Sequence, residues 1–234
     1  MKQNLSHLVF ILDRSGSMAS TVKDAEGGFD ATIDKQKDEP GECRVTLVEF
    51  SDGVETIFED RQLHAVEKLK LSPSGSTALR DALGTTIEHV GHKLVTLSEH
   101  DRPAKVIFVV ITDGGENASR QYGPERIKEM IEHQQSVYGW TFFFLGANQD
   151  AVTTGTALGF NVGQTLTFNA TERGTIASYD TICRALSSTR SGDTYAFTDA
   201  DRADAVAQDP ATTVKGALPV STPLTDTRSI RPKR

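Results

Sequence analysis

The chain alternates short apolar runs with segments of helical periodicity over most of its length. Residues 8–12 form a continuous apolar run, which is typical of a strand covered on both faces. The next apolar residues recur at three- and four-residue steps, at Val22, Ala25, Phe29 and Ile33. This spacing indicates an amphipathic helix with one buried face. The chain therefore opens with a strand followed by a helix.

The same alternation continues to about residue 186. Apolar runs predict strands at residues 43–50, 53–58, 105–113, 140–146 and 165–168. Helical spacing predicts helices over residues 79–97, 124–137, 150–158 and 172–186. Pro124 suits a first helical position, and Asn169 with Glu172 three residues later has the pattern of a capping box for the last helix.

Only Ser51 and Asp52 separate the second and third predicted strands, so these two strands form an antiparallel hairpin at one edge of a sheet. The other strands are linked through helices, which is the connection that parallel strands need. We therefore predict an α/β fold with a doubly wound, mostly parallel six-stranded sheet, one antiparallel edge strand and helices on both faces. Such sheets bind ligands beyond the carboxyl ends of their strands, where the strand order reverses.

We divide the chain at residue 188. Residues 1–188 form the α/β domain, and residues 189–234 form an Asp/Thr/Pro-rich tail that is too poor in apolar residues for a second core. We expect the tail to be extended and packed on the surface of the domain. Its candidate anchors are Tyr195 and Phe197, followed by Val214, Leu218, Val220 and Leu224.

Charge and composition exclude some partners. The formal net charge of −7 argues against a nucleic-acid partner, because phosphate binding needs clustered positive charge. No apolar run approaches the roughly 20 residues of a membrane helix, and the first residues fit a strand better than a secretory signal. Cys43 and Cys183 lie far apart, with neither metal nor disulfide spacing. We therefore expect a cytoplasmic protein without a membrane partner, and its oligomeric state does not follow from the sequence.

Three polar clusters follow an apolar run or precede a helix. They are residues 13–17 after the first strand, residues 74–77 before the long helix, and residues 112–115 after the central strand. In a doubly wound sheet these three loops converge on the same crevice. The first cluster alone allows three interpretations: a helix N-cap, a nucleophile on a tight turn, or oxygen ligands around a hard cation.

Together the clusters offer two carboxylates, from Asp13 and Asp113, and three hydroxyls, from Ser15, Ser17 and Thr77. All of these are hard oxygen donors, which suit Mg²⁺ or Mn²⁺ and not soft metals. Alternation along an extended segment also places positions 13, 15 and 17 on one side of the chain. The three clusters therefore predict a divalent-metal site, with Ca²⁺ as a poorer fit than Mg²⁺ or Mn²⁺.

At these residues the chain resembles the von Willebrand factor type A domain family and its metal-ion-dependent adhesion site (MIDAS). That motif reads Asp-x-Ser-x-Ser, then a separate Thr, then a separate Asp-Gly. It is matched here, in this order, by Asp13, Ser15, Ser17, Thr77 and Asp113. The order, the approximate spacing and the strand–helix context agree over residues 5–186.

The resemblance implies a non-enzymatic, divalent-metal-dependent protein-binding module. Ser15, Ser17 and Thr77 would bind the cation directly or through water, and Asp13 and Asp113 often act through bound waters. The sixth position would be taken by an Asp or Glu side chain of a partner protein.

Each cluster also has a structural interpretation. Asp13 or Ser15 could cap a helix, Thr77 could be the N-cap of the long helix, and Asp113 with its two glycines is ordinary turn chemistry. Three coincidences in the right order are required for that outcome, so we favour the metal site.

Neighbouring side chains leave further alternatives open. Asp81 shares a helix face with Thr77 and either orients a metal-bound water or is a surface charge in the first helical turns. Glu116 and Asn117 either line the edge of the site or are exposed loop residues. We expect Arg14 to be exposed to solvent.

Two other function classes compete with a binding module. The first is a Mg²⁺-dependent phosphoryl-transfer or phosphatase enzyme with Asp13 as its nucleophile. The dehalogenase-like version of that chemistry needs a second Asp, at the position of Ser15, and a nearby Lys. None of the three loops contains a lysine. The second is a scaffold or regulatory partner of an AAA+ ATPase or a stress-resistance system, as the resemblance to small bacterial and phage-type members implies. Neither Gly-x-Ser-x-Gly nor a phosphate-binding glycine loop is present.

Overall fold

The computed structural model describes residues 1–147 and 150–208 of the 234-residue chain. Its strands are β1 (Lys2–Asp13), β2 (Glu42–Phe50), β3 (Val54–Gln62), β4 (Pro103–Thr112), β5 (Thr141–Ala147) and β6 (Thr165–Phe168). Its α-helices are α1 (Val22–Lys37), α2 (Leu79–Thr96), α3 (Pro124–Tyr138), α4 (Ala151–Ala157), α5 (Glu172–Ser191) and α6 (Asp199–Ala205). Within these residues, no helix combines the length and apolar character that crossing a membrane requires.

The six strands form one sheet in the order β3-β2-β1-β4-β5-β6. β2 and β3 pair antiparallel as the predicted edge hairpin, and every other neighbouring pair is parallel. Ile11 on β1 aligns with Val48 on one side and with Val110 on the other. From β1 the chain builds outward to β3 and then crosses to β4, so the strand order reverses between β1 and β4. The predicted doubly wound sheet is confirmed.

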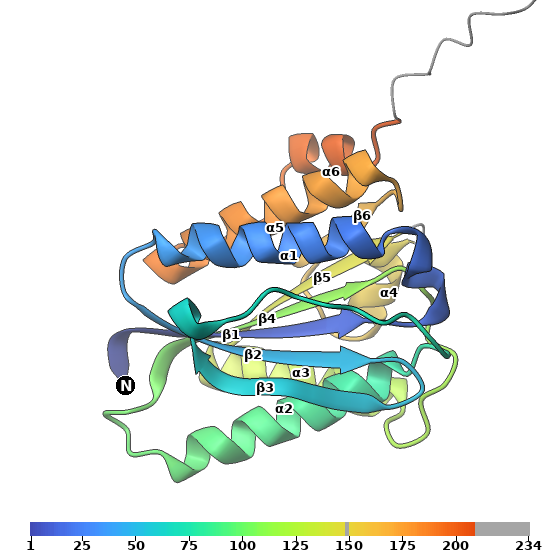
Figure 1. The fold of residues 1–234 in the computed structure, drawn as a ribbon. Coiled ribbons are helices and arrows are strands. Elements are labelled where there is room, and N and C mark those ends of the chain that lie inside the picture. The colour runs from blue at the N-terminus through green and yellow to red at the C-terminus, as the bar shows by residue number, and fades with distance from the viewer. Residues whose placement is uncertain (148–149, 209–234) are drawn as a thin grey trace, which may run out of the picture.

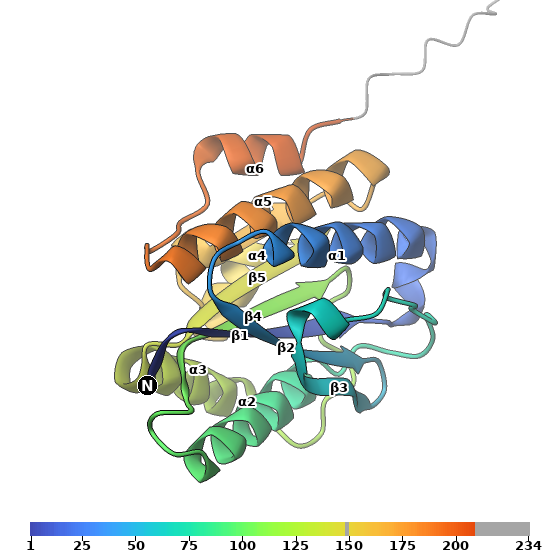
Figure 2. The ribbon, with the colours of Figure 1, turned by 60° about the vertical axis from the view of Figure 1, so that its left-hand side comes forward.

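Helices cover both faces of this sheet (Figure 1). In both views α1 and α5 lie side by side over one face, while α2 and α3 lie over the other (Figure 2). The side chains of β1 alternate between the two layers: Phe10 and Leu12 pack into the core beneath α1 and α5, and Val9 and Ile11 pack into the opposite core. Burial on both faces is the reason for the continuous apolar run in the sequence.

The start of the last predicted helix differs from the expected capping box. The N-cap of α5 is Thr171, whose hydroxyl accepts a hydrogen bond from the backbone N–H of Gly174 at 3.1 Å. Asn169 instead donates its side-chain amide to the carbonyl of Val206 at 2.7 Å. The Asn169–Glu172 capping box is therefore wrong, because the end of α6 engages Asn169.

The apolar pattern does not predict α6. Residues after 188 were expected to be extended, but α5 continues to Ser191 and a helix follows at Asp199–Ala205. Thr198 and Asp201 exchange hydrogen bonds in a capping box at the start of this helix. Local capping chemistry therefore forms a helix in a segment with few apolar residues.

Aromatic side chains attach this segment to the domain. Phe197 is 5% exposed, and its ring lies 5.6 Å from that of Phe143 on β5, centroid to centroid. Tyr195 is partly buried against the same core. The remaining expected anchors, Val214, Leu218, Val220 and Leu224, lie outside the described residues, and the division at residue 188 stays a prediction.

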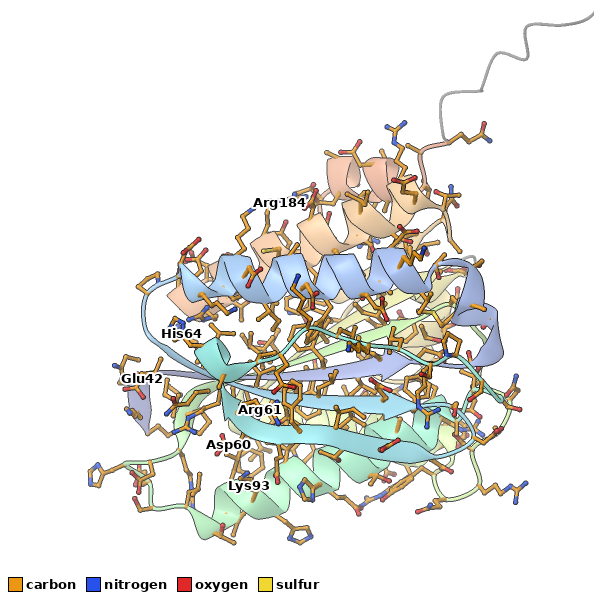
Figure 3. All side chains as sticks on the ribbon, viewed as in Figure 1. Glu42, Asp60, Arg61, His64, Lys93 and Arg184 are labelled. Atoms are coloured by element: carbon orange, nitrogen blue, oxygen red, sulfur yellow. The ribbon has the colours of Figure 1, made fainter. Side chains whose placement is uncertain are left out.

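A buried histidine lies in β1, and it lines the same cavity as Lys93 of α2. His7 on β1 is 3% exposed, and its Nε2 lies 2.8 Å from Thr46 Oγ1. Burial lowers the pKa of His7 to about 4, because the charged imidazole would lose its hydration. Asp60 and Lys93, labelled in Figure 3, form an ion pair beside it at 3.7 Å. Asp60 and Glu59 oppose the lowering of the pKa, and Lys93 and Arg44 reinforce it.

His7 predicts a loss of stability in mild acid. Its pKa is 6.5 in an unfolded chain and about 4 in the folded one, so the unfolded chain binds the proton first as the pH falls. The contribution of His7 to the free energy of unfolding is complete above pH 6.5. It is lost as the pH falls from there through the pKa of about 4 in the folded chain. The total is about 3 kcal/mol at roughly 1.4 kcal/mol per pKa unit.

Urea denaturation at neutral pH and near the folded pKa measures this loss. We expect His7→Gln to lose less stability than the wild-type chain over this interval, since Gln binds no proton. The matched control is His64→Gln, at an exposed histidine labelled in Figure 3, and it should keep the wild-type dependence. Equal pH dependence in the His7 variant and the wild-type chain would contradict the assignment.

Candidate metal centre

Three loops meet beyond the carboxyl ends of β1 and β4, where the strand order reverses (Figure 1). Leu12 aligns with Ile111 in the parallel pairing of these strands. The last residues of the two strands, Asp13 and Thr112, therefore lie side by side. The second loop in chain order ends at Thr77, just before α2 begins at Leu79. The fold thus brings the three polar clusters of the sequence to one edge of the sheet.

Backbone hydrogen bonds connect the three loops. The N–H of Gly16 donates to the carbonyl of Gly75 at 3.0 Å, which joins the first loop to the second. The N–H of Asn117 donates to the carbonyl of Thr77 at 3.0 Å, which joins the third loop to the second. The relative positions of the loops are therefore set by main-chain contacts.

The side chains form a continuous network. Asp13 accepts hydrogen bonds from the N–H of Ser15 at 2.7 Å and from the hydroxyl of Thr112 at 2.5 Å. The hydroxyls of Ser15 and Ser17 lie 3.1 Å apart. Ser17 in turn donates to Asp113 Oδ1 at 2.5 Å. Four of the five predicted ligands are thus linked in one chain of hydrogen bonds.

The fifth predicted ligand, Thr77, faces the same space. A Cβ atom added to Gly114 would lie 2.9 Å from Thr77 Oγ1, 3.5 Å from Ser17 Oγ and 3.8 Å from Asp13 Oδ2. The same atom on Gly115 would meet nothing within 4 Å. Hydroxyl and carboxylate oxygens therefore converge beside Gly114, and this donor set fits a hard divalent cation.

Hydroxyl ligands are essential to such a site. In the part of the chain that the structure describes, no three His, Cys, Asp or Glu side chains are grouped so that they could hold a metal ion. Two carboxylates alone leave most positions of an octahedral cation unfilled. Ser15, Ser17 and Thr77 offer further oxygens on these loops.

Burial shields both carboxylates from water, completely at Asp13 and in part at Asp113. Asp13 is fully buried, and burial raises its pKa; hydrogen bonds from Thr112 and Ser15 offset part of that rise. Burial likewise raises the pKa of Asp113, and the bond from Ser17 offsets part of the rise. A bound cation would stabilise both charged forms, because opposite charge favours ionisation.

The structure therefore brings together all five residues that the sequence singled out, and their role as metal ligands stays a prediction. Thr112 was not among them, although its hydroxyl donates to Asp13. The available signal was a hydroxyl residue at the end of an otherwise apolar strand.

Asn117 is exposed, in agreement with one of its two interpretations, but other neighbouring residues differ from expectation. Asp81 is 7% exposed, so the surface-charge interpretation is wrong, and its carboxylate accepts hydrogen bonds from backbone N–H groups of residues 120–122. Glu116 is half-buried, and its carboxylate binds the start of α2 and its own loop. Arg14 is also half-buried, because it lies 3.5 Å from both Glu49 and Glu55.

Several solved structures share this fold. Proximal thread matrix protein 1 from the mussel byssus has a TM-score of 0.58 at 14% identity, over 79% of this chain and 46% of that chain. Another structure of the mussel protein, with a zinc-occupied MIDAS motif, has a TM-score of 0.57 at 15% identity, over 78% and 46%. A von Willebrand factor type A structure from Catenulispora acidiphila has a TM-score of 0.54 at 15% identity, over 78% and 43%. This chain thus covers less than half of each of these structures.

No curated protein matches the chain. A family model described as the von Willebrand factor type A domain matches residues 7–181. The matched range begins within β1, ends within α5 and contains all five candidate ligands. The chain belongs to the von Willebrand factor type A domain family.

Proposed function

We propose that this protein is a divalent-metal-dependent protein-binding module without enzymatic activity. One observation carries the proposal: Thr77, Ser17 and Asp13 direct oxygens to the space beside Gly114, and Asp113 contacts Ser17. Von Willebrand factor type A domains generally mediate protein interactions, and the mussel structure holds zinc at the equivalent motif. For this chain we propose Mg²⁺ or Mn²⁺, because every donor is a hard oxygen.

The donor set favours an acidic ligand from a partner. Both oxygens of Asp13 already accept hydrogen bonds, from Ser15 and Thr112. Neutral hydroxyls would therefore make much of the direct contact with the cation. A cation held by neutral oxygens remains strongly attractive to anions, so an Asp or Glu side chain of a partner would complete its coordination.

The two adjacent glycines provide a test of the metal site. Calorimetric titration with Mn²⁺ should find one site in the wild-type chain. Gly114→Ala should weaken binding about tenfold or more, because its methyl group would stand among the donor oxygens. Gly115→Ala is the matched control and should bind as the wild-type chain does, since its methyl group would meet no atom. Equal losses in both variants would place the metal elsewhere.

The free energy of unfolding distinguishes a metal ligand from a residue of the hydrophobic core. Ser17→Ala should abolish most Mn²⁺ binding with little change in the free energy of unfolding of the metal-free protein, because Ser17 is exposed. Val109→Ala, at a fully buried β4 position, should cost about 2 kcal/mol and leave metal binding intact. If Ser17→Ala unfolds as readily as Val109→Ala in urea, the serine cluster is structural.

The partner can be sought by affinity capture with the purified chain as bait, in Mg²⁺ and in EDTA. We expect a partner protein that is retained in Mg²⁺, released by EDTA and not retained by Thr77→Ala. A partner that remains bound under all three conditions would instead indicate a scaffold role in which the metal site is idle.

The enzyme alternative predicts turnover. The binding-module proposal predicts that the wild-type chain with Mg²⁺ does not hydrolyse p-nitrophenyl phosphate above the rate of Asp13→Asn. Hydrolysis that Asp13→Asn abolishes would establish Asp13 as a nucleophile and overturn the proposal.

We also propose a reducing, cytoplasmic location. Cys43 and Cys183 are both buried and unpaired. Burial raises the pKa of the Cys43 thiol to about 11, so very little of it is in the reactive thiolate form at neutral pH. Both cysteines therefore act as core residues, which is compatible with a compartment where thiols stay reduced.

A further inference from the structure

The first turn of α2 is capped by a different segment of the chain. Its N-cap residue, Ala78, has no side chain that can accept a hydrogen bond. The N–H of Arg80 instead donates to Glu116 Oε2 at 2.9 Å, and the N–H of Asp81 donates to the hydroxyl of Ser119 at 3.0 Å. The loop after β4 thus satisfies backbone donors that a helix normally leaves to its own N-cap.

The side chain of Asp81, in the first turn of α2, accepts hydrogen bonds from the same loop. Its Oδ2 accepts the N–H of Arg120 at 2.8 Å, and its Oδ1 accepts the N–H groups of Gln121 at 2.9 Å and Tyr122 at 3.0 Å. Asp81 is 7% exposed, so these bonds are shielded from water. One buried carboxylate therefore fixes three consecutive residues of the loop to α2, and hydrogen bonds to an ionised acceptor are among the stronger ones.

Thr77 is held by the same loop. Its N–H donates to Asn117 Oδ1 at 2.8 Å, and its carbonyl accepts the N–H of Asn117 at 3.0 Å. Asn117 is only four residues from Asp113. The segment that carries the Thr77 hydroxyl and the segment that carries the Asp113 carboxylate are thus joined by two hydrogen bonds.

A glycine of α2 makes room for Tyr122, at the end of this loop. A Cβ atom on Gly84, one turn after Arg80 and Asp81, would lie 2.5 Å from the ring of Tyr122. The ring can therefore pack against α2 only because position 84 has no side chain. Gly91, further along the same helix, has nothing within 4 Å of the equivalent point.

We propose that Asp81 is a positioning residue that fixes the spacing between Thr77 and Asp113, with Glu116 and Tyr122 completing the attachment of the loop to α2. The inference rests on the proposed metal-binding function. Both oxygens of Asp81 are taken by backbone N–H groups, so Asp81 acts on the metal site through the loop. Mn²⁺ affinity therefore depends on a residue outside the family motif.

The first test uses the two glycines of α2, which changes packing without removing a polar group. Gly84→Ala should displace Tyr122 and weaken Mn²⁺ binding about tenfold, as loss of supporting contacts does at other metal sites. Gly91→Ala should keep wild-type affinity. Titrations are made well below the melting temperature of each variant, so that unfolding does not contribute. Wild-type affinity in Gly84→Ala would overturn the role of the Tyr122 contact.

The second test compares two buried aspartates that each lie in the first turn of a helix. Asp201 in α6 is 6% exposed and accepts hydrogen bonds from Thr198 and Arg184, far along the chain from the candidate site. Both Asp81→Ala and Asp201→Ala should lower the melting temperature of the metal-free protein. Only Asp81→Ala should weaken Mn²⁺ binding, by about tenfold or more, and Asp81→Asn should recover part of the loss because its amide oxygen still accepts.

These outcomes separate the inference from the proposed function. Wild-type binding that survives Asp81→Ala overturns the positioning role and leaves the metal site in place. Equal loss of affinity in Asp81→Ala and Asp201→Ala also overturns it, because the effect is then one of stability alone. Absence of Mn²⁺ binding in the wild-type chain overturns both proposals together.

Discussion

The parallel pairing of β1 with β4 is the constraint on which the candidate site depends. Because Leu12 aligns with Ile111, the last residues of the two strands lie side by side, and the Thr112 hydroxyl can donate to Asp13. Asp13 is fully buried, and a buried carboxylate without a hydrogen-bond donor would be strongly destabilising. The strand register therefore makes it possible to hold a charge at this edge of the sheet, and the serine and threonine hydroxyls gather around that charge.

This arrangement links the proposed function to stability. Burial raises the pKa of both Asp13 and Asp113, which means that their charged forms are disfavoured by the fold. A divalent cation would relieve that cost, so the metal-bound protein should be more stable than the metal-free one. The cation would also leave a position for an acid from a partner. In the proposed function, the cost of burying these two charges would favour binding of the metal first and, through the bound cation, of the partner second.

The loops that carry the proposed ligands differ in how they are held. Asp13 lies at the end of a central strand, whereas Thr77 and Asp113 lie on the connections that precede α2 and follow β4. Reciprocal hydrogen bonds between the start of α2 and the loop after β4 join these two connections, through Asp81 on one side and Glu116 on the other. A site built partly on loops can in this way acquire fixed geometry from helix-capping contacts.

The sequence by itself determined the features that depend on neighbours along the chain. The apolar run of β1 predicts a strand buried on both faces, Pro124 and Gly139 mark the ends of α3, and the short link between β2 and β3 requires a hairpin. The spacing of Asp13, Ser15 and Ser17 is likewise local. Only the tertiary structure decided which distant groups meet. Asn169 binds the end of α6 and leaves the N-cap of α5 to Thr171, and Asp81 is buried against residues 120–122. Periodicity and capping act over a few residues, whereas these choices depend on which donors the packed sheet and helices bring within hydrogen-bond distance.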